Sequence, residues 1–176
     1  MRKLSLFIAM SLDGYIAKPG DDLDFLKLVE QEGEDYGHAA FMKEVDTILI
    51  GRRTYDHVVK HIDATYYDNG ERDVYVATRT ARRRQGRTTF YTGQPHELVE
   101  RLRGEPGGKI YCDGGAEVID ALLHHDAVDE MIISVVPVLV GAGTRLFKNG
   151  RPEQRLTLSS ARSFASGLVQ LHYLRR

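Results

Sequence analysis

The sequence predicts an α/β protein whose sheet is mostly parallel, with an antiparallel edge at its C-terminal end. Strand-like runs alternate with helical stretches over the first two thirds of the chain, which is the pattern of a parallel sheet. In the last third, two strand-like runs flank the hairpin signal Ala165-Ser166-Gly167. Of the 176 residues, 42% are hydrophobic and 28% are charged, as in an ordinary soluble domain. We therefore expect one domain that covers residues 1–176.

The strands expected in the first two thirds are short runs rich in Val, Ile, Leu, Phe and Tyr. They cover Leu4–Met10, Thr47–Gly51, Asp73–Thr78 and Lys109–Cys112. The helical stretches between and after them are Phe25–Glu32, Glu34–Lys43, Thr54–Lys60, Glu97–Arg103 and Gly115–His124. The last of these helices has one apolar face, made by Val118, Ile119, Leu122 and Leu123.

The last third is expected to supply the antiparallel strands. Met131–Val140 is a long apolar run, and Pro137 within it predicts a bulge or a sheet edge. Leu156–Phe164 and Leu168–Leu174 are the two arms of the expected hairpin. The Met131–Val140 run could belong to the core, or it could serve as the interface of a homodimer.

The composition excludes several classes of protein. With 24 basic and 25 acidic residues, the net charge of −1 does not favour nucleic acid or an anionic membrane as a partner. No apolar run approaches the roughly 20 residues that span a bilayer, and the N-terminus lacks a signal-peptide cleavage pattern. Cys112 is the only cysteine, and the histidines form no recognisable metal pattern, so we expect no metal site. The expected location is the cytoplasm.

The segment Gly51-Arg52-Arg53-Thr54 lies where an apolar strand meets the start of a helix. A helix start offers free backbone N–H groups and the positive end of the helix dipole, so it can bind a phosphate. Gly51 lets a ligand approach the backbone, the arginines add positive charge, and Thr54 adds a hydroxyl at an N-cap-like position. The motif points to a nucleotide or another phosphorylated molecule, although a glycine turn with solvated arginines would look the same.

Asp113-Gly114-Gly115-Ala116-Glu117 forms a second junction of the same kind, again between a strand and a helix. Two adjacent glycines permit close contact between backbone and ligand, although they also suit a plain tight turn. Two such turns in one α/β domain favour a ligand crevice at the strand ends. The chain has no G-x-G-x-x-G motif, so the ordinary Rossmann fingerprint is absent.

Two further segments are candidates for ligand contact. Ser11–Asp24 is a long segment after the first strand, and ordered loops of this length are often lids or binding loops. Thr78 and Arg79 end the strand Asp73–Thr78. If that end lies beside Gly51, the two residues could bind a second phosphate, the 2′-phosphate of NADP.

Five motifs in a fixed order resemble those of a known family. They are Ser-Leu-Asp-Gly-Tyr-Ile-Ala from residue 11, Ile-Leu-Ile-Gly-Arg-Arg-Thr-Tyr from residue 48, Val-Ala-Thr-Arg from residue 76, Ile-Tyr-Cys-Asp-Gly-Gly-Ala from residue 110, and Val-Val-Pro-Val-Leu-Val-Gly-Ala-Gly-Thr-Arg-Leu-Phe from residue 135. Each motif is weak alone, but five in order are fairly specific. The chain resembles the dihydrofolate-reductase-like superfamily, and within it the riboflavin-biosynthesis reductase domain and its stand-alone relatives.

The resemblance implies a mixed sheet of about eight strands with helices on both faces, and a pyridine nucleotide across the strand ends. It implies that Ala9 and Ile16 flank the nicotinamide, and that Gly114 and Gly115 meet the cofactor through their backbone, with a cis peptide between them as one possibility. It also makes a homodimer plausible. The remaining cofactor contacts that it implies are Gly51, Arg52, Arg53, Thr54, Thr78, Arg79, Ala116, Glu117 and Val118.

Two positions depart from dihydrofolate reductase itself. Glu117 stands where that enzyme has an arginine beside the adenosine, which weakens the case for a 2′-phosphate, although Arg52, Arg53 and Arg79 favour NADP. Asp113 stands where that enzyme has an apolar residue. The riboflavin branch tends to carry an acidic residue there, so Asp113 argues against folate and for a hydroxyl-rich or cationic substrate.

We therefore expect an NADPH-dependent reductase, with NAD as a possible cofactor. It would transfer a hydride to a C=N or C=O bond of a small, polar heterocyclic or sugar-bearing substrate. The candidate proton donors are Asp13, Asp22, Asp24 and Asp113, which the sequence does not rank. The alternatives are a non-catalytic nucleotide-binding module on the same fold, a domain that binds no ligand, and dihydrofolate reductase activity.

Overall fold

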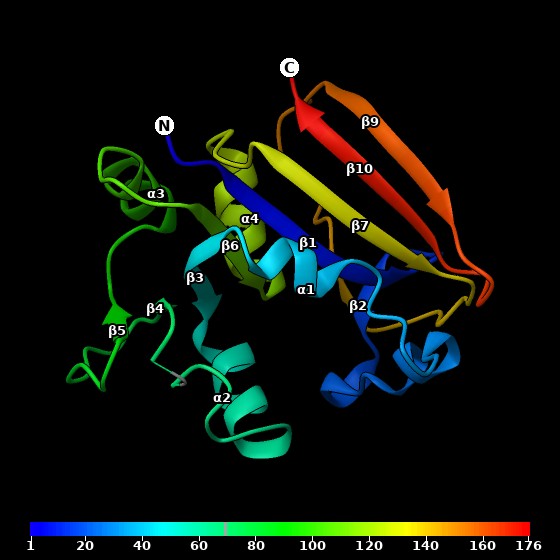
Figure 1. Cartoon of the computed structure of the whole chain (residues 1–176), viewed down its shortest axis with the longest axis horizontal. Coiled ribbons are helices and arrows are strands. Elements are labelled where there is room, and N and C mark those ends of the chain that lie inside the picture. The colour runs from blue at the N-terminus through cyan, green and yellow to red at the C-terminus, as the bar shows by residue number, and fades with distance from the viewer. Residues whose placement is uncertain (69) are drawn as a thin grey trace.

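The computed structural model describes residues 1–68 and 70–176. Within them, an eight-stranded sheet forms the middle layer of the molecule (Figure 1). Its strand order is β5-β4-β3-β6-β1-β7-β10-β9; the strands from β5 to β7 are parallel, and β10 and β9 are antiparallel to their neighbours. The strands are β1 (Leu4–Ser11), β3 (Val45–Gly51), β4 (Asp73–Ala77), β5 (Thr88–Tyr91), β6 (Lys109–Gly114), β7 (Glu130–Val136), β9 (Leu156–Ser163) and β10 (Val169–Arg175).

This arrangement confirms the predicted fold class, but the predicted strand Met131–Val140 is too long. β7 ends at Val136, because the next residue, Pro137, has no backbone N–H to donate to a neighbouring strand. β7 pairs with β1 on one side and with β10 on the other. The strand belongs to the core, because it has a neighbour on each side and Met131, Ile133 and Val136 are buried. A homodimer interface formed by this run stays a prediction.

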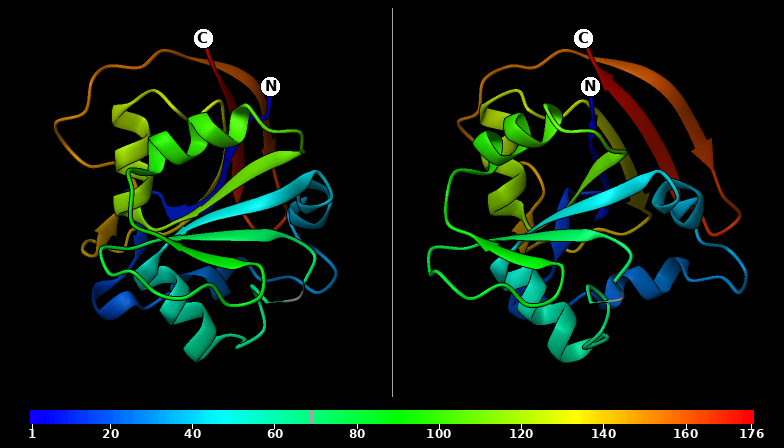
Figure 2. Two further views of the ribbon diagram at one scale, coloured as in Figure 1. Left: turned by 90° about the vertical axis from the view of Figure 1, so that its left-hand side faces the viewer. Right: turned by 60° about the vertical axis from the view of Figure 1, so that its left-hand side comes forward.

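One face of the sheet is covered by α3 (Pro95–Arg103) and α4 (Ala116–His124). The predicted apolar face of α4 is confirmed, and it packs on alternate side chains of β1 and β6. Leu4 and Leu6 of β1 and Ile119 of α4 are fully buried there. Each such side chain contributes about 1.5–3 kcal/mol through burial. Figure 2 shows α3 and α4 on the side of the sheet opposite to α2.

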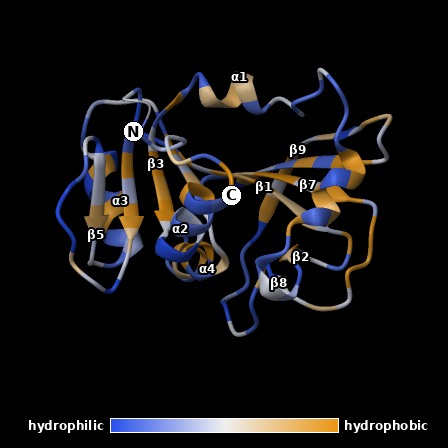
Figure 3. Ribbon diagram, turned by 90° about the horizontal axis from the view of Figure 1, so that it is seen from below, coloured by the Kyte–Doolittle hydropathy of each residue, from blue (hydrophilic) through white to orange (hydrophobic). Residues whose placement is uncertain are grey.

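The other face carries α1 (His38–Met42), α2 (Arg52–His61) and the 3-10 helix η2 (Asp24–Val29). Figure 3 shows α1 on one side of the strands, several of which are largely orange. The predicted helices Phe25–Glu32 and Glu34–Lys43 are both too long: the first is a short 3-10 helix and the second begins only at His38. Gly37, with φ of 82°, precedes α1 in a conformation that other residues rarely adopt.

The segment after β1 holds more regular structure than an open loop. It contains β2 (Tyr15–Ala17) and the 3-10 helix η1 (Pro19–Asp21), and β2 pairs with β8 (Thr144–Arg145). The pairing ties this segment to the chain that follows β7. None of the helices in the described part of the chain combines the length and hydropathy that crossing a membrane requires.

Candidate active site

The two glycine turns predicted from the sequence lie side by side at the carboxyl end of the parallel strands. β3 and β6 are neighbours in the sheet, and Ile50 lies opposite Gly114 in their register. A Cβ atom on Gly51 would lie 3.1 Å from Cγ2 of Val118 and 3.3 Å from the backbone nitrogen of Gly115. The starts of α2 and α4 are therefore packed closely together, and the space beside residue 51 suits a glycine.

The second turn approaches α2 just as closely. A Cβ atom on Gly115 would lie 2.7 Å from Oγ1 of Thr54, which is the third residue of α2 and not its N-cap. The peptide bond between Gly114 and Gly115 is cis. Neither α2 nor α4 has a side-chain cap among the described residues. Two uncapped helix starts at one point of the sheet are suited to bind phosphate groups.

Arg52 and Arg53, in the first turn of α2, are both engaged with carboxylates. Nε of Arg52 donates to the two carboxylate oxygens of Asp56 at 2.6 and 2.7 Å, and its guanidinium lies 5.7 Å from the centre of the Phe90 ring. Nη2 of Arg53 pairs with Asp21 of η1 at 2.7 Å. The positive charge is thus close to the open helix starts, but an anion bound there has to compete with these two carboxylates.

Thr78 and Arg79 do lie beside the Gly51 turn. Ala77, the last residue of β4, is opposite Gly51 in the register of β3 and β4, and Thr78 follows it directly. Oγ1 of Thr78 accepts a hydrogen bond from the backbone N–H of Thr80 at 3.2 Å, and Arg79 is exposed. The structure therefore meets the geometric condition on which a second phosphate contact depends.

The first turn of α4 holds two buried residues and one exposed residue. Ala116 and Val118 are buried against the core, whereas the side chain of Glu117 is 88% exposed. Nζ of Lys148 contacts the Glu117 carboxylate. Lys148 therefore offsets the negative charge that opposes a bound phosphate at this position.

Asp113, the residue before the paired glycines, forms hydrogen bonds to two tyrosines on the face of the sheet that carries α1. The hydroxyl of Tyr67 donates to Oδ2 of Asp113 at 2.5 Å, and that of Tyr111 lies 2.7 Å from Oδ1. Burial raises the pKa of Asp113 above its ordinary value, although both hydrogen bonds and the nearby His38 act to lower it. Asp113 therefore holds a proton more readily than an exposed aspartate.

The Tyr111 hydroxyl has two acceptors within reach but only one hydrogen. It lies 3.1 Å from the backbone oxygen of Phe7 and 2.7 Å from Oδ1 of Asp113. When Asp113 is ionised, Tyr111 can donate to the carboxylate. When Asp113 is protonated, Tyr111 can turn its hydrogen to Phe7 and accept one from Asp113. The site can accommodate both protonation states without losing a hydrogen bond.

The other three candidate carboxylates lie in different surroundings. Asp13 accepts hydrogen bonds from Ser11 at 2.6 Å and from the backbone N–H groups of Val140 and Gly141 at 3.1 and 2.7 Å. The bond from Ser11 is the main cause of its lowered pKa. Asp13 therefore joins the segment after β1 to the segment after β7.

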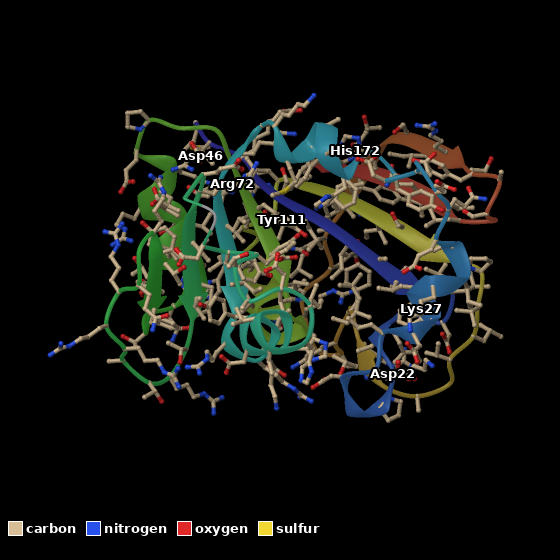
Figure 4. The ribbon with its side chains drawn as sticks, turned by 60° about the horizontal axis from the view of Figure 1, so that its bottom comes forward. Asp22, Lys27, Asp46, Arg72, Tyr111 and His172 are labelled. Carbon is tan, nitrogen blue, oxygen red and sulfur yellow. The ribbon has the colours of Figure 1, made fainter. Side chains whose placement is uncertain are left out.

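Asp22 and Asp24 belong to the exposed segment around η1 and η2. The backbone N–H of Asp24 and the ammonium of Lys18 contact Asp22 and lower its pKa. Asp24 pairs with Lys27 at 2.6 Å. Figure 4 places Asp22 and Lys27 near the edge of the molecule and Tyr111 near the middle of the sheet, so these carboxylates are apart from the Asp113 group.

Two cavities open on the α1 face of the sheet and share His38 in their walls. The larger, of about 580 Å³, is lined by Phe7 and Ala9 of β1 and by residues of η2 and the chain leading to α1. The smaller, of about 340 Å³, is lined by Tyr67 among others. Asp113 itself lines neither cavity; its partner Tyr67 lines the smaller one, and His38, whose charge acts on Asp113, lines both. Ile16, on β2, packs instead against the core on the α4 side.

The model of the RibD C-terminal domain family matches residues 2–170. The chain belongs to this family. It is 38% identical over 175 residues to the uncharacterized protein YwjB of Bacillus subtilis, covering 99% of this chain and 98% of that protein. It is also similar to the crystal structure of a candidate riboflavin biosynthesis protein from Shewanella sp. PV-4, with 30% identity, a TM-score of 0.88 and 99% coverage of both chains.

The fold is shared more widely than the sequence. A deaminase/reductase structure from Thermotoga maritima superposes with a TM-score of 0.72 at 12% identity, covering 99% of this chain and 57% of that one. These neighbours confirm the predicted dihydrofolate-reductase-like fold and its riboflavin-biosynthesis branch. Together with the family, they indicate a reductase-type function.

Sequence reasoning missed the residues that surround Asp113. From the sequence, Tyr67 lies in a polar loop where it could line a pocket or be an ordinary surface aromatic; in the structure it is 3% exposed and lines the smaller cavity. Tyr111 reads as an ordinary strand residue. The alternation of residues along β6 does place Tyr111 and Asp113 on one face, so that signal was present. Among the described residues, no group of three or more His, Cys, Asp or Glu side chains is arranged to hold a metal ion.

Proposed function

We propose that this protein is an NADPH-dependent reductase that transfers a hydride to a C=N or C=O bond of a small, polar heterocyclic or sugar-bearing substrate. The observation that carries the proposal is the meeting of three features at the end of β6. The uncapped starts of α2 and α4 lie together, and Asp113 lies one residue before the turn that opens α4. This arrangement offers a phosphate site next to a protonatable group.

The residues present fit a pyridine nucleotide. Gly51 and Gly115 place no side chain between the starts of α2 and α4. The free backbone N–H groups of both helix starts are available to a pyrophosphate. Arg79, beside the Gly51 turn, and the two arginines of α2 favour NADPH over NADH. The contact of Lys148 with Glu117 removes the main objection to a 2′-phosphate.

The substrate would occupy the larger cavity, whose wall includes Ala9 at the centre of the sheet. When bound, the nucleotide would supply a hydride, that is a proton with two electrons, to the carbon of the C=N or C=O bond. Asp113 donates the proton that the nitrogen or oxygen needs, and it then regains one from solvent. The products are NADP⁺ and the amine or alcohol, so atoms and charge balance.

Asp113 suits this role better than the other three carboxylates. Its raised pKa favours the protonated form, and Tyr111 can stabilise either form by turning its hydrogen. The pKa values of Asp13 and Asp22 are lowered by their hydrogen bonds, which makes them poorer acids near neutral pH. Asp13 instead positions the segment that carries Ile16.

The test begins with titration of the protein with NADPH and NADH by isothermal calorimetry. Oxidation of NADPH is then followed by absorbance with a panel of imines and carbonyl compounds. We expect micromolar NADPH affinity and turnover of at least one class of substrate. Asp113→Asn is expected to keep the affinity and to lower kcat by about 10²–10⁴-fold, whereas Asp22→Asn, the matched control, changes neither.

The proposal fails at two distinguishable points. If NADPH does not bind, the phosphate site is wrong. If NADPH binds tightly but no substrate of the panel is reduced, the non-catalytic nucleotide-binding module becomes the better description. Equal kcat in wild type and Asp113→Asn would show that another group supplies the proton.

A further inference from the structure

The larger cavity has an apolar floor and an acidic rim. Phe7, Ala9, Leu26, Val29 and Leu168 supply its apolar lining. Four carboxylates stand in the short stretch of its wall between η2 and α1, at Glu30, Glu32, Glu34 and Asp35. A volume of about 580 Å³ is ample for a one- or two-ring molecule.

No lysine or arginine of the described chain lines this cavity, and His38 is the only basic residue in its wall. The start of α1 is also closed to an anion, because Asp35 already accepts hydrogen bonds from the backbone N–H groups of Gly37 and Ala39 at 2.9 and 2.8 Å. These bonds lower the pKa of Asp35 and keep it ionised. A phosphate group in this cavity would meet four carboxylates and neither a lysine nor an arginine.

The inner end of the cavity offers a hydrogen-bond donor. Ser134 is 4% exposed, lines the cavity, and lies opposite Ala9 in the register of β1 and β7. Its Oγ accepts a hydrogen bond from Nε2 of Gln170 at 3.1 Å. Its own hydrogen has no acceptor among the described residues, so a buried donor is available to a ligand.

We propose that this cavity selects an unphosphorylated, cationic aromatic or heteroaromatic substrate. A carbonyl or ring nitrogen at its inner end accepts the Ser134 hydrogen bond beside Ala9, and its positive charge lies at the rim between residues 30 and 35. The inference rests on the proposed function, because it takes this cavity as the substrate pocket. Phosphate recognition is then confined to the cofactor side, where Arg52, Arg53 and the two helix starts lie.

Three ring-matched aldehydes test the charge preference. They are cationic 4-(trimethylammonio)benzaldehyde, neutral 4-(hydroxymethyl)benzaldehyde and dianionic 4-formylphenyl phosphate. Each is titrated into ¹⁵N-labelled protein saturated with NADP⁺, and amide shifts of residues 30–38 and Ser134 report binding. We expect the cation to bind at least about tenfold more tightly than the dianion at low salt, and the difference to shrink as salt is added.

Two double variants separate the rim from the overall charge. Glu30→Gln/Glu32→Gln removes the two rim carboxylates that cap no backbone N–H group, and we expect it to weaken the cation about three- to tenfold and leave the neutral probe unchanged. Glu100→Gln/Glu105→Gln removes the same charge on and just after α3, on the opposite face, and should change no affinity.

Three outcomes would overturn the inference: the phosphate binds as tightly as the cation, none of the three probes shifts the cavity amides at millimolar concentration, or the two double variants behave alike. The NADPH titration is a separate measurement. If the nucleotide does not bind, the proposed function fails, and the probes titrated without nucleotide still decide the charge preference. If the nucleotide binds and the phosphate probe is preferred, only the substrate class is wrong.

Discussion

Replacement of Asp113 by asparagine changes how the stability of the protein depends on pH. In the folded chain, burial raises the pKa of Asp113 above its ordinary value of 3.8, so the folded protein keeps this proton after the unfolded chain has lost it. Where the folded state binds one proton more than the unfolded state, the free energy of unfolding falls as pH rises. Asparagine has nearly the same shape and cannot ionise, so the variant lacks this fall.

The size of the effect follows from the binding of one proton and from the hydrogen bond of Tyr67 to Asp113. Between pH 3.8 and the raised pKa, the wild type should lose about 1.4 kcal/mol per pH unit relative to Asp113→Asn. Above the raised pKa the difference becomes constant. Tyr67→Phe removes a hydrogen bond of 2.5 Å that is worth about 1.5–3 kcal/mol to the carboxylate, so in that variant the decline should continue to higher pH.

Urea unfolding at a series of pH values from 3.5 to 8 measures this difference. Circular dichroism is the suitable probe because the chain has no tryptophan. No substrate is needed, so the measurement is independent of the proposed reaction. A difference between wild type and Asp113→Asn that stays constant from pH 4 to pH 8 would refute the reasoning, since Asp113 would then ionise in the folded chain as it does in the unfolded one.

Four further predictions concern the rest of the structure. Gly115→Ala places a Cβ atom 2.7 Å from Oγ1 of Thr54 and should weaken NADPH binding at least tenfold in a fluorescence titration, while the circular dichroism spectrum stays unchanged. Arg52→Ala should weaken NADPH by about 1.5–3 kcal/mol in calorimetry, and Asp56→Asn, which frees Arg52, should not. Glu130→Gln should lower the free energy of unfolding by about 3–5 kcal/mol in urea, because Glu130 is buried between Ser5, Lys109 and His172. Burial acts to raise the pKa of Glu130, but the hydrogen bonds leave this pKa below its ordinary value of 4.5. The stabilisation by Glu130 is therefore present above pH 4.5 and is lost as pH falls through the lowered pKa. Cys112 is 1% exposed and burial raises its pKa to about 12, so a thiol reagent should modify it only at the rate of unfolding.

The parallel half of the sheet was predictable because each of its longer strands is a continuous apolar run. β1, β3, β4 and β6 were all predicted to within a few residues. β5, with the sequence Thr88-Thr89-Phe90-Tyr91, escaped notice because it follows an arginine-rich turn and is only four residues long. The two-residue strand β8 has no pattern of its own and depends on its pairing with β2.

Sequence patterns located the glycine turns but could not show which side chains gather around them. The contact of Tyr67 with Asp113 joins residues 46 positions apart, and it forms because the chain after α2 folds back over β3 and β6. The cavity was not predicted either, because its four carboxylates fall in the two expected helices Phe25–Glu32 and Glu34–Lys43. In the structure they lie in the irregular segment between η2 and α1. Local patterns predict elements, whereas both of these features are products of tertiary packing.

The position of β1 in the middle of the sheet shapes how a newly made chain can fold. Ser5 lies opposite Tyr111 on one side and opposite Glu130 on the other, so both neighbours of the first strand emerge from the ribosome roughly a hundred residues after it. Until then, the side chains of Leu4 and Leu6, which are fully buried in the folded protein, stay exposed to solvent. A synthesis pause before residue 109 would leave an apolar segment open to chaperones, and to aggregation in their absence.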